Sequence, residues 1–474
     1  MRLTIKQKMT KIKFGTDGWR AIIAKEYTVN NVARVSIAVA DWLNENNETP
    51  SVVIGHDCRF AGELFAETAA KVLASKGVVV KLAKGFVSTP MVSLGVVKER
   101  ASLGVVITAS HNPPSYNGYK LKGDFGGPLL PADITAVENK IPDTNSIDLD
   151  VISMDDLVAK GKIIYIDLEN MYCKHAESKF DLDIINNSAM NFAYDAMFGS
   201  GMNVVKRLLP NATLLHCDDN PGFLGTAPEP IHRNLQEFSD LMKNNNLDCG
   251  LATDGDADRI GLYDGKGHFV DSHHIILLLI HYLAKYKKMK GKIVTAFSCS
   301  VKVAQICKHY GLEQETVQIG FKHITGKMMT EDVLLGGEES GGIATAGHIP
   351  ERDGIWMGLI LFEFMAKSEK SLENLIAEVY EIVGEFAFER IDLHIDNDTK
   401  LSIIEMCKAG KFTKFGKYEV EKVETIDGFK FFFDADTWLM IRPSGTEPVL
   451  RTYAEAKTQE KVFDILADCK ATIL

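Results

Sequence analysis

A serine that follows a short apolar run has the setting of a nucleophile. Residues 103–107 are apolar and predict a strand, and residues 108–114 continue as Thr-Ala-Ser-His-Asn-Pro-Pro. Ligands of open α/β sheets collect at the carboxyl ends of strands, and the prolines restrict the loop that presents the hydroxyl. Ser110 is therefore the best candidate for the residue that reacts. A strand exit with two prolines is also typical of an ordinary turn, so this run needs support from elsewhere in the chain.

Three carboxylates alternate along the chain at Asp254, Asp256 and Asp258, after a short apolar run. Their oxygens can converge on one hard cation, and with no His or Cys in the segment the pattern favours magnesium or calcium over zinc. An EF-hand loop would need Gly at its sixth position and Glu at its twelfth, where this chain has Arg259 and Gly265. The sequence therefore predicts a magnesium site, with a solvated acidic turn as the alternative.

Two later segments offer groups for an anion and for hydroxyls. The Arg-Pro-Ser-Gly-Thr-Glu-Pro turn at 442–448 presents a guanidinium fork, hydroxyls and backbone N–H groups, which together suit a phosphate. Its predicted phosphate ligands are Arg442, Ser444, Gly445, Thr446 and, just beyond the turn, Arg451. The glycine-rich segment 336–342 carries Glu338 and Ser340, which can bind the vicinal hydroxyls of a sugar. A plain hairpin turn and a flexible acidic loop are the respective alternatives.

Strand-like and helix-like segments alternate along most of the chain, which predicts α/β domains. From about residue 386 alternating apolar and polar residues predict an antiparallel sheet with a final helix at 459–473, which is an α+β domain. The predicted fold class is α/β: three similar α/β domains with mixed sheets, then a smaller α+β domain. The predicted domains are 1–148 with the serine loop, 149–253, 254–370 with the aspartates at its start and the Glu338 loop, and 371–474 with the phosphate turn.

Length and composition fit a large globular protein. The 474 residues, 46% hydrophobic and 25% charged, leave room for three or four domains and a sizeable core. A net charge of −11 provides no basic surface for nucleic acid. The eight cysteines lack metal or disulfide spacing, and the longest apolar run, 275–280, is too short to span a membrane. We therefore expect a cytoplasmic protein with reduced thiols and neither nucleic-acid nor membrane partners.

Taken together, these segments resemble the α-D-phosphohexomutase superfamily, which includes phosphoglucomutase, phosphomannomutase and phosphoglucosamine mutase. The resemblance covers nearly the whole chain, from Phe-Gly-Thr-Asp-Gly-Trp-Arg at 14–20 to the turn at 442–448, with the motifs in the family's order. It implies four domains around a central cleft. It also implies an isomerase of the phosphoglucomutase/phosphomannomutase branch, which interconverts hexose 1-phosphate and hexose 6-phosphate and is a monomer or dimer.

The resemblance also implies a mechanism. Ser110 would carry a phosphoryl group and donate it to the free hydroxyl of a hexose monophosphate, giving a hexose 1,6-bisphosphate that also serves as activator. Mg²⁺ held by the three aspartates and an oxygen on Ser110 would neutralise the migrating group. Arg20, His111 and Lys120 would lie beside that group. Lys120 is the leading candidate for general base if neighbouring cations lower its pKa, and a plain phosphate contact is its alternative role.

Further contacts follow from the same resemblance. Arg259 would touch the phosphoserine or pair with the aspartates, and Arg352 and Lys322 would contact the sugar phosphate. The chain departs from the pattern at Gly342, where glucosamine mutases and dual-specificity bacterial enzymes have His, whose role His348 or His323 would have to assume.

The choice of substrate rests on one position of the sugar loop. Glucosamine mutases have Gln where this chain has Glu339, so an unmodified hexose, glucose or mannose, is favoured. Phosphoglucosamine mutase is the alternative, and a magnesium-dependent sugar-phosphate phosphatase is a further one. A sugar-phosphate sensor would be expected to lose Ser110 or an aspartate, and all four residues are present.

Overall fold

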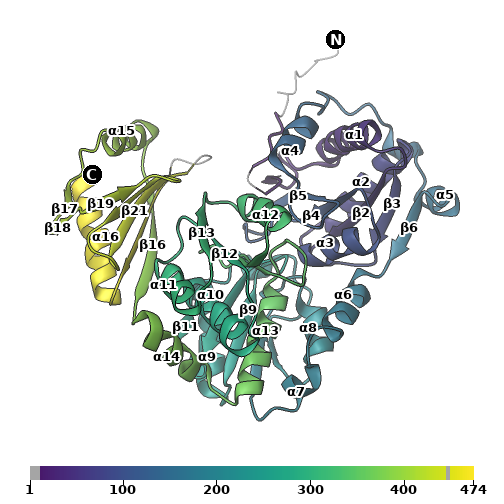
Figure 1. The fold of residues 1–474 in the computed structure, drawn as a ribbon. Helices are drawn as coiled ribbons and strands as arrows, with labels where there is room; N and C mark the ends of the chain where they lie inside the picture. Colours follow the sequence, from purple (N-terminus) through teal and green to yellow (C-terminus); the bar gives the residue numbers. More distant parts are fainter. Residues whose placement is uncertain (1–10, 16, 445–448) are drawn as a thin grey trace.

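The computed structural model describes residues 11–15, 17–444 and 449–474, and its strands form four main sheets in chain order. Figure 1 shows the first unit at one end of the molecule, the fourth at the other, and the second and third between them. Three sheets are mixed and covered by helices, and the fourth is antiparallel. The predicted fold class, three α/β domains followed by a different C-terminal domain, is confirmed.

The first sheet holds the strand that leads to Ser110. Its order is β1-β5-β4-β2-β3-β6; β2, β3, β4 and β6 are parallel to one another, and β5 pairs antiparallel with both β4 and β1. The strands are β1 (Trp19–Ile22), β2 (Ser51–His56), β3 (Val79–Ala83), β4 (Leu103–Ile107), β5 (Tyr116–Gly123) and β6 (Ile163–Ile166). The helices are α1 (Val29–Asn46), α2 (Gly62–Ser75), α3 (Thr89–Lys98), α4 (Pro131–Glu138), α5 (Met154–Ala159) and the short η1 (Leu149–Val151). Every residue of β4 is buried, as its apolar sequence requires of a central strand.

The second sheet has the order β11-β10-β9-β7-β8. Its strands are β7 (Phe192–Asp195), β8 (Thr213–Leu215), β9 (Cys249–Thr253), β10 (Ile260–Asp264) and β11 (Phe269–Val270). Its helices are α6 (Leu168–Glu177), α7 (Leu182–Asn186), α8 (Met202–Leu208), α9 (Gln236–Asn244) and the short η2 (Phe223–Gly225) and η3 (His232–Asn234). Strands β9 and β10 are an antiparallel hairpin whose loop carries the three aspartates.

The sheets divide the chain at other places than the predicted boundaries. Strand β6 lies beyond residue 148 but pairs with β3 of the first sheet. Residues 254–270, expected to open the third domain, belong to the second sheet. The reason is physical: β9 and β10 exchange backbone hydrogen bonds across the aspartate loop, so no boundary can separate them.

The third sheet, of order β13-β12-β14-β15, presents the glycine-rich loop between its last two strands. The strands are β12 (Lys292–Ala296), β13 (Gln314–Val317), β14 (Val333–Gly337) and β15 (Ile343–Thr345). The helices are α10 (Ser272–His281), η4 (Tyr282–Tyr286), α11 (Lys302–Tyr310), α12 (Phe321–Thr330), α13 (Gly354–Ser368) and α14 (Leu372–Val383). Helix α13 is buried over nearly its whole length and belongs to one apolar cluster with β9 and β10, which joins the second and third units.

The fourth sheet has the order β16-β22-β21-β20-β19. Its elements are β16 (Ala387–His394), β19 (Lys422–Glu424), β20 (Phe429–Phe432), β21 (Trp438–Pro443), β22 (Val449–Ala456), α15 (Asn397–Lys408) and α16 (Gln459–Ile473), beside a small hairpin of β17 (Lys414–Phe415) and β18 (Tyr418–Glu419). One face, with Leu439 and Ile441, packs on α16, and the other, with Trp438 and Met440, packs on Phe297 of the third unit. Alternate residues therefore serve two different interfaces.

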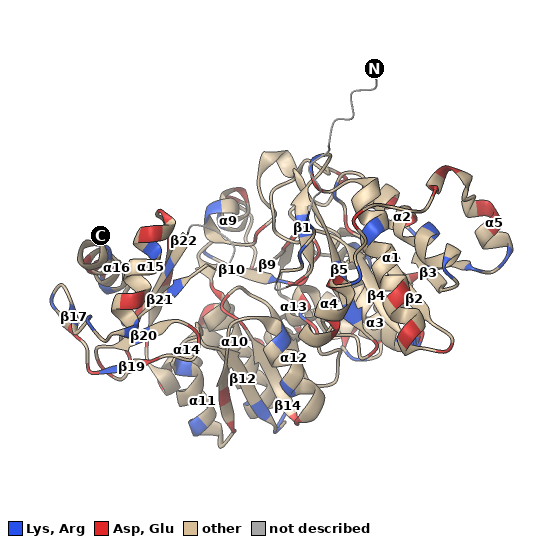
Figure 2. Ribbon diagram, turned by 90° about the horizontal axis from the view of Figure 1, so that it is seen from above, with Lys and Arg blue, Asp and Glu red and all other residues tan. Residues whose placement is uncertain are grey.

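The charged residues show no segregation by sign in Figure 2, where Lys and Arg alternate with Asp and Glu over the elements in view. Attraction of an anionic ligand must therefore come from particular side chains rather than from a general field. In the part of the chain that the structure describes, no helix has both the length and the apolar character to cross a membrane.

Candidate active site

Ser110 lies just after β4 and is almost completely buried. Its Oγ donates to Asp254 Oδ2 at 2.7 Å and lies 3.2 Å from His111 Nδ1. The predicted nucleophile and the first predicted metal ligand, 144 residues apart in sequence, are thus in direct contact. Ser110 has a φ of 52°, a left-handed conformation that costs a non-glycine residue about 1 kcal/mol or more and is kept only where surroundings impose it.

The surroundings that impose it centre on Arg59, which the sequence analysis did not single out. Its guanidinium donates to four carbonyl oxygens of the serine loop, those of Ser110 (2.6 Å), Asn112 (2.5 Å), Pro113 (2.9 Å) and Tyr116 (3.1 Å). Its position in the sequence could have indicated this role. Arg59 follows β2, the parallel neighbour of β4, and parallel strands end at the same edge of a sheet.

Asp57 contacts both Arg59 and Thr108, the residue that directly follows β4. The Asp57 carboxylate lies 3.3 Å from Arg59 Nε and accepts from Thr108 Oγ1 at 2.5 Å. Thr108 Oγ1 in turn accepts from the Ser110 backbone N–H at 2.8 Å. The Ser110 backbone is therefore held at its carbonyl by Arg59 and at its N–H by Thr108, and the Asp57 carboxylate contacts both of these residues.

The three aspartates are fully buried, and one ligand oxygen from each lies within 4.8 Å of the others. Among the described residues this is the one cluster of its kind. Asp256 Oδ1 and Asp258 Oδ1 are buried and have no hydrogen-bond partner among residues 11–15, 17–444 and 449–474. Burial, and then the charges of Asp256 and Asp258, raise the pKa of Asp254 well above its usual value. Unpaired hard oxygens and mutual repulsion both fit a bound divalent cation.

The remaining carboxylate oxygens orient the cluster. Asp256 Oδ2 accepts from Thr89 Oγ1 at 2.5 Å and from Lys120 Nζ at 2.7 Å. Asp254 Oδ1 accepts from the backbone N–H groups of residues 258 and 259. A Cβ at Gly255 would lie 2.7 Å from the Ser110 carbonyl oxygen, so only glycine permits this approach of the two loops. The first unit thus positions a loop that belongs to the second sheet.

Lys120 has the opposite electrostatic setting from the one expected. Burial lowers its pKa, but Asp17, Asp256 and Asp258 lie within 3.0 Å of its Nζ, and together they raise the pKa above the usual value. The Lys120 pKa is thus raised, and not lowered by nearby cations as its proposed role as a base requires. Its closest partners are carboxylates, so the ammonium form is stabilised.

Asp17 is a further member of the site that sequence reasoning passed over, although it stands in the quoted 14–20 segment. It contacts Lys120 at 2.9 Å and Arg352 Nη2 at 2.5 Å. Arg352 Nη2 also lies 2.7 Å from Asp258 Oδ2. The pKa of Asp17 is held well below its usual value, because these cations outweigh the effect of burial. One charge network therefore joins the first, second and third units.

Arg20 and His111 also lie where the sequence predicts, next to the serine loop. Arg20 Nη1 donates to Asn112 Oδ1 at 2.7 Å. Burial, followed by the charges of Arg259 and Arg20, lowers the pKa of His111 well below its usual value, so its imidazole is neutral. Arg259 Nε lies 4.0 Å from Asp254 Oδ2, the oxygen that accepts from Ser110 Oγ.

The glycine-rich loop brings Glu338 into the interior. Its Oε1 accepts from the Gly320 backbone N–H at 2.9 Å. Burial raises the pKa of Glu338 to about 7, although Arg352 opposes the shift. Ser340 stands half-buried in the turn between β14 and β15. Lys322, near the start of α12, makes no ion pair with any residue that the structure describes.

The glycine that departs from the family pattern has a steric reason. A Cβ at Gly342 would lie 2.3 Å from Arg352 Cδ, so Arg352 fills the space beside this position. Of the two suggested substitutes for a histidine, His348 is buried and bound to Asp353 (2.9 Å) and His175 (3.2 Å). His348 therefore links α6 to the start of α13, which is a structural role.

The predicted phosphate ligands that the structure describes, Arg442, Ser444 and Arg451, lie at the same end of β21 and β22. Arg442 and Arg451 are directly opposite each other on β21 and β22. Arg442 is bound by Asp427, and Arg451 Nε lies 3.9 Å from Asp392 Oδ2. Lys400 Nζ donates to the Ser444 carbonyl at 3.4 Å. Gly445 and Thr446 lie outside the described residues.

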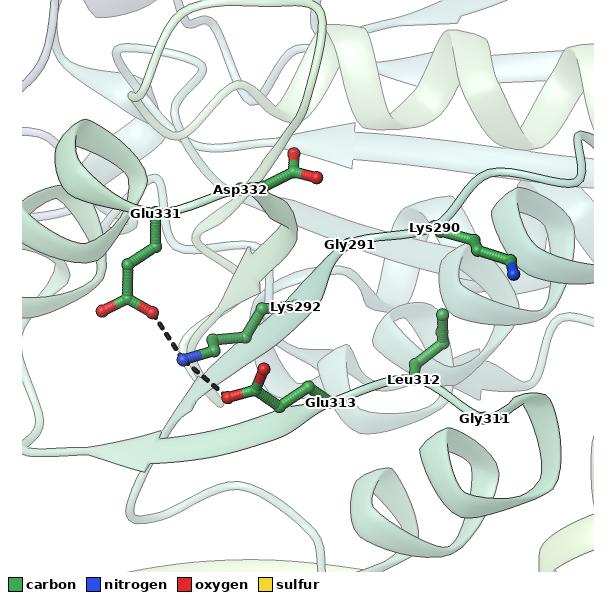
Figure 3. A pocket seen from close by; sticks show the side chains of 8 residues that line it. All are labelled: Lys290, Gly291, Lys292, Gly311, Leu312, Glu313, Glu331 and Asp332. Atoms are coloured by element: carbon green, nitrogen blue, oxygen red, sulfur yellow. Dashed lines mark hydrogen bonds and ion pairs between the residues drawn. The ribbon is translucent and has the colours of Figure 1, made fainter.

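Two cavities of the molecule lie away from these residues. One of about 370 Å³ stands at the amino ends of β12, β13 and β14, where Lys292 lies between Glu313 and Glu331 (Figure 3). The other, of about 1060 Å³, lies between the end of α14 and the turn at 434–437. Neither is lined by Ser110 or the aspartates, so the candidate site rests on the contacts of its side chains and not on cavity size.

Comparison with known proteins shows which family the chain belongs to. Models of the phosphoglucomutase/phosphomannomutase α/β/α domains I, II and III and C-terminal domain match residues 11–147, 170–267, 271–383 and 406–471. The chain is 29% identical to a phosphoglucomutase/phosphomannomutase of Thermococcus kodakarensis over 96% of each chain. It is 31% identical to a phosphoglucosamine mutase of Methanococcus vannielii, covering 87% of this chain and 90% of the relative.

Solved structures agree. The fold is similar to that of a candidate phosphomannomutase from Thermus thermophilus, with a TM-score of 0.86, 29% identity, and 98% and 99% of the two chains covered. A phosphoglucomutase from Paramecium has a TM-score of 0.81 at 19% identity, with 98% and 96% covered, which is a likeness of fold. The chain therefore belongs to the phosphoglucomutase/phosphomannomutase family, whose members are isomerases of the α-D-phosphohexomutase superfamily.

Proposed function

We propose that this protein interconverts the 1-phosphate and 6-phosphate of glucose, mannose or both, through a phosphoserine at Ser110 and a hexose 1,6-bisphosphate. The observation that carries the proposal is the 2.7 Å contact between Ser110 Oγ and Asp254, inside a buried trio of carboxylates. A phosphoryl group on this oxygen would lie against the carboxylates, and a divalent cation is needed to make such a contact favourable.

The proposed cation is magnesium, held by Asp254, Asp256, Asp258 and an oxygen on Ser110. The two unpartnered aspartate oxygens support this assignment, and the all-oxygen donor set suits a hard ion. When bound, the ion supplies charge neutralisation for phosphoryl transfer. A hexose 1,6-bisphosphate is the proposed activator, because it can load the serine.

The chain's own residues would carry the transfer as follows. The P–O bond to Ser110 breaks as a sugar hydroxyl oxygen bonds to phosphorus. The hydroxyl gives up its proton and the released Ser110 Oγ takes one up, so the transfer leaves the proton count unchanged. His111 Nδ1, neutral and 3.2 Å from Ser110 Oγ, can move a proton at that oxygen. Lys120, kept charged by its carboxylate neighbours, suits a contact to the migrating oxygens better than proton abstraction. Arg20 and Arg259 would complete the positive lining around that group.

The intermediate must bind in two opposite orientations, so one site holds the phosphate that does not react. We assign that site to the fourth sheet, with Arg442, Ser444, Gly445, Thr446 and Arg451. The ring hydroxyls would contact Glu338, Ser340, Arg352 and Lys322. Two arginines opposite each other on neighbouring strands support the assignment, because planar guanidinium groups match phosphate oxygens.

The substrate can be tested directly. With magnesium and a trace of glucose 1,6-bisphosphate, we expect turnover of glucose 1-phosphate or mannose 1-phosphate to exceed that of glucosamine 1-phosphate. The basis of this expectation is Glu339, which stands where glucosamine mutases have Gln and whose Oε2 accepts from Ser298 Oγ at 2.5 Å. Fastest turnover of glucosamine 1-phosphate would instead identify a phosphoglucosamine mutase, the name borne by several relatives. Release of free phosphate without isomer would identify a phosphatase.

Replacing Arg59 with lysine is expected to lower kcat about 100-fold, because one ammonium group cannot bind four carbonyls and the serine loop loses its fixed geometry. The rate of glucose 1-phosphate isomerisation measures this. Arg233→Lys is the matched control, since the Arg233 side chain is 75% exposed. A wild-type kcat in Arg59→Lys would show that the loop holds its shape without the guanidinium.

A further inference from the structure

Asp427 connects the phosphate site of the fourth unit to the backbone of the third. It stands in the turn between β19 and β20. Arg442 donates to it twice, from Nε to Oδ1 at 3.0 Å and from Nη2 to Oδ2 at 3.2 Å. The same Oδ2 accepts from the Ile319 backbone N–H at 3.0 Å. One carboxylate therefore holds a guanidinium fork and crosses the boundary between two units.

The next backbone amide binds the sugar loop. Gly320 N–H donates to Glu338 Oε1 at 2.9 Å, so consecutive amides hold Asp427 and Glu338. Gly320 has a φ of 125°, a conformation that glycine adopts readily and other residues rarely do. The Gln318 side chain reaches across to the Ile426 carbonyl at 3.5 Å. Residues 318–320 are thus a short bridge between the sugar loop and the turn that carries Asp427.

We propose that Asp427 is a positioning residue for substrate binding, which sets the distance and angle between the Arg442 guanidinium and Glu338. This inference rests on the proposed function, in which Arg442 binds the unreacting phosphate and Glu338 the ring hydroxyls. A bidentate carboxylate fixes a guanidinium in plane and leaves its outer edge for an anion. The span from phosphate to hydroxyls is then constant in both orientations of one hexose bisphosphate.

The chain offers a matched control at the other end of the same interface. Asp436, also in the fourth unit, binds Lys302 Nζ at 3.0 Å and Gln305 Nε2 at 2.6 Å of the third unit. It therefore contributes to docking of the two units without touching Arg442. If Asp427 served only to join the units, loss of either carboxylate would have a similar effect.

The test compares Asp427→Asn with Asp436→Asn in the full-length protein. The amide keeps the shape and one acceptor oxygen but loses the charge-assisted pair of bonds. We expect KM for glucose 1-phosphate to rise about tenfold in Asp427→Asn with kcat within about twofold, because the lost contact acts on bound substrate and transition state alike. Asp436→Asn should leave both constants close to wild type. Equal KM values for the two variants would overturn the proposal.

A double variant shows whether the effect passes through Arg442. In an Arg442→Lys background, Asp427→Asn should change KM by less than about twofold, since the fork that it orients is already gone. A full tenfold rise in that background would overturn the positioning role. If the wild-type protein isomerises no hexose phosphate, the proposed function fails on its own. Weaker binding of inorganic phosphate by Asp427→Asn but not by Asp436→Asn, measured calorimetrically, would then still support the role of Asp427.

Discussion

Ser110→Ala is expected to lower the rate of hexose phosphate isomerisation by about 10⁴-fold or more, because no other group can carry the phosphoryl through the exchange. Wild-type protein incubated with glucose 1,6-bisphosphate should gain the mass of one phosphoryl group, and the variant should gain none. The position of Ser110, at the end of β4 and against Asp254, is the physical basis of this expectation.

Ser93→Ala is the matched control for that experiment. Ser93 is also a fully buried serine of the first unit, and its Oγ has no hydrogen-bond partner in the part of the chain that the structure describes. Its loss should leave both the rate and the phosphoryl uptake unchanged. Isomerisation at the wild-type rate by Ser110→Ala would rule out the phosphoserine route altogether.

Asp254→Asn is expected to lower kcat about 10³-fold and to remove the stabilisation that magnesium gives. At a magnesium concentration about one hundred times its dissociation constant, the wild-type protein should gain about 2.7 kcal/mol, read as a higher Tm. In the presence of a chelator, the Tm of Asp254→Asn should be equal to that of the wild-type protein or higher. The reason is that burial and two neighbouring carboxylates make the ionised Asp254 side chain unfavourable without a cation.

Asp264→Asn provides the comparison, because Asp264 ends the same hairpin on the side away from the trio and binds the backbone of residues 266 and 268. It should keep the magnesium-dependent rise in Tm. A rise of equal size in Asp254→Asn, together with wild-type turnover, would show that the aspartates do not bind the ion.

Much of this architecture could be predicted because local patterns and global fold agree. The alternating residues after 386 predicted an antiparallel sheet, and β16, β19, β20, β21 and β22 form one. The apolar run at 103–107 predicted the central strand β4. The hairpin of β9 and β10 was not recognised, since a loop rich in charge looks like a boundary in sequence. Only pairing of the two strands shows that it lies inside a sheet.

The candidate site divides in the same way. Ser110 and the aspartates can be recognised in the sequence, because a serine at a strand exit and three carboxylates at alternate positions are local patterns that suit catalysis and metal binding. Arg59 and Asp57 do not, since their role is to bind backbone and side-chain atoms of a loop 51 residues or more away, which no local pattern encodes. The pKa of Lys120 was expected in the wrong direction for a related reason. Its sign depends on which charges are nearest in space, and those come from Asp17 and the loop of the second sheet.

The charge network of Asp17, Lys120, Asp258 and Arg352 has a consequence for how the molecule matures. Its members leave the ribosome in that order, and Arg352 comes last, with the third unit. Until that unit docks, two carboxylates lack their guanidinium partner, and the loop that faces the serine is not fully balanced in charge. A half-made chain therefore has Ser110 without the complete charge network around it, and we expect the proposed phosphoserine to form only after the third unit has docked.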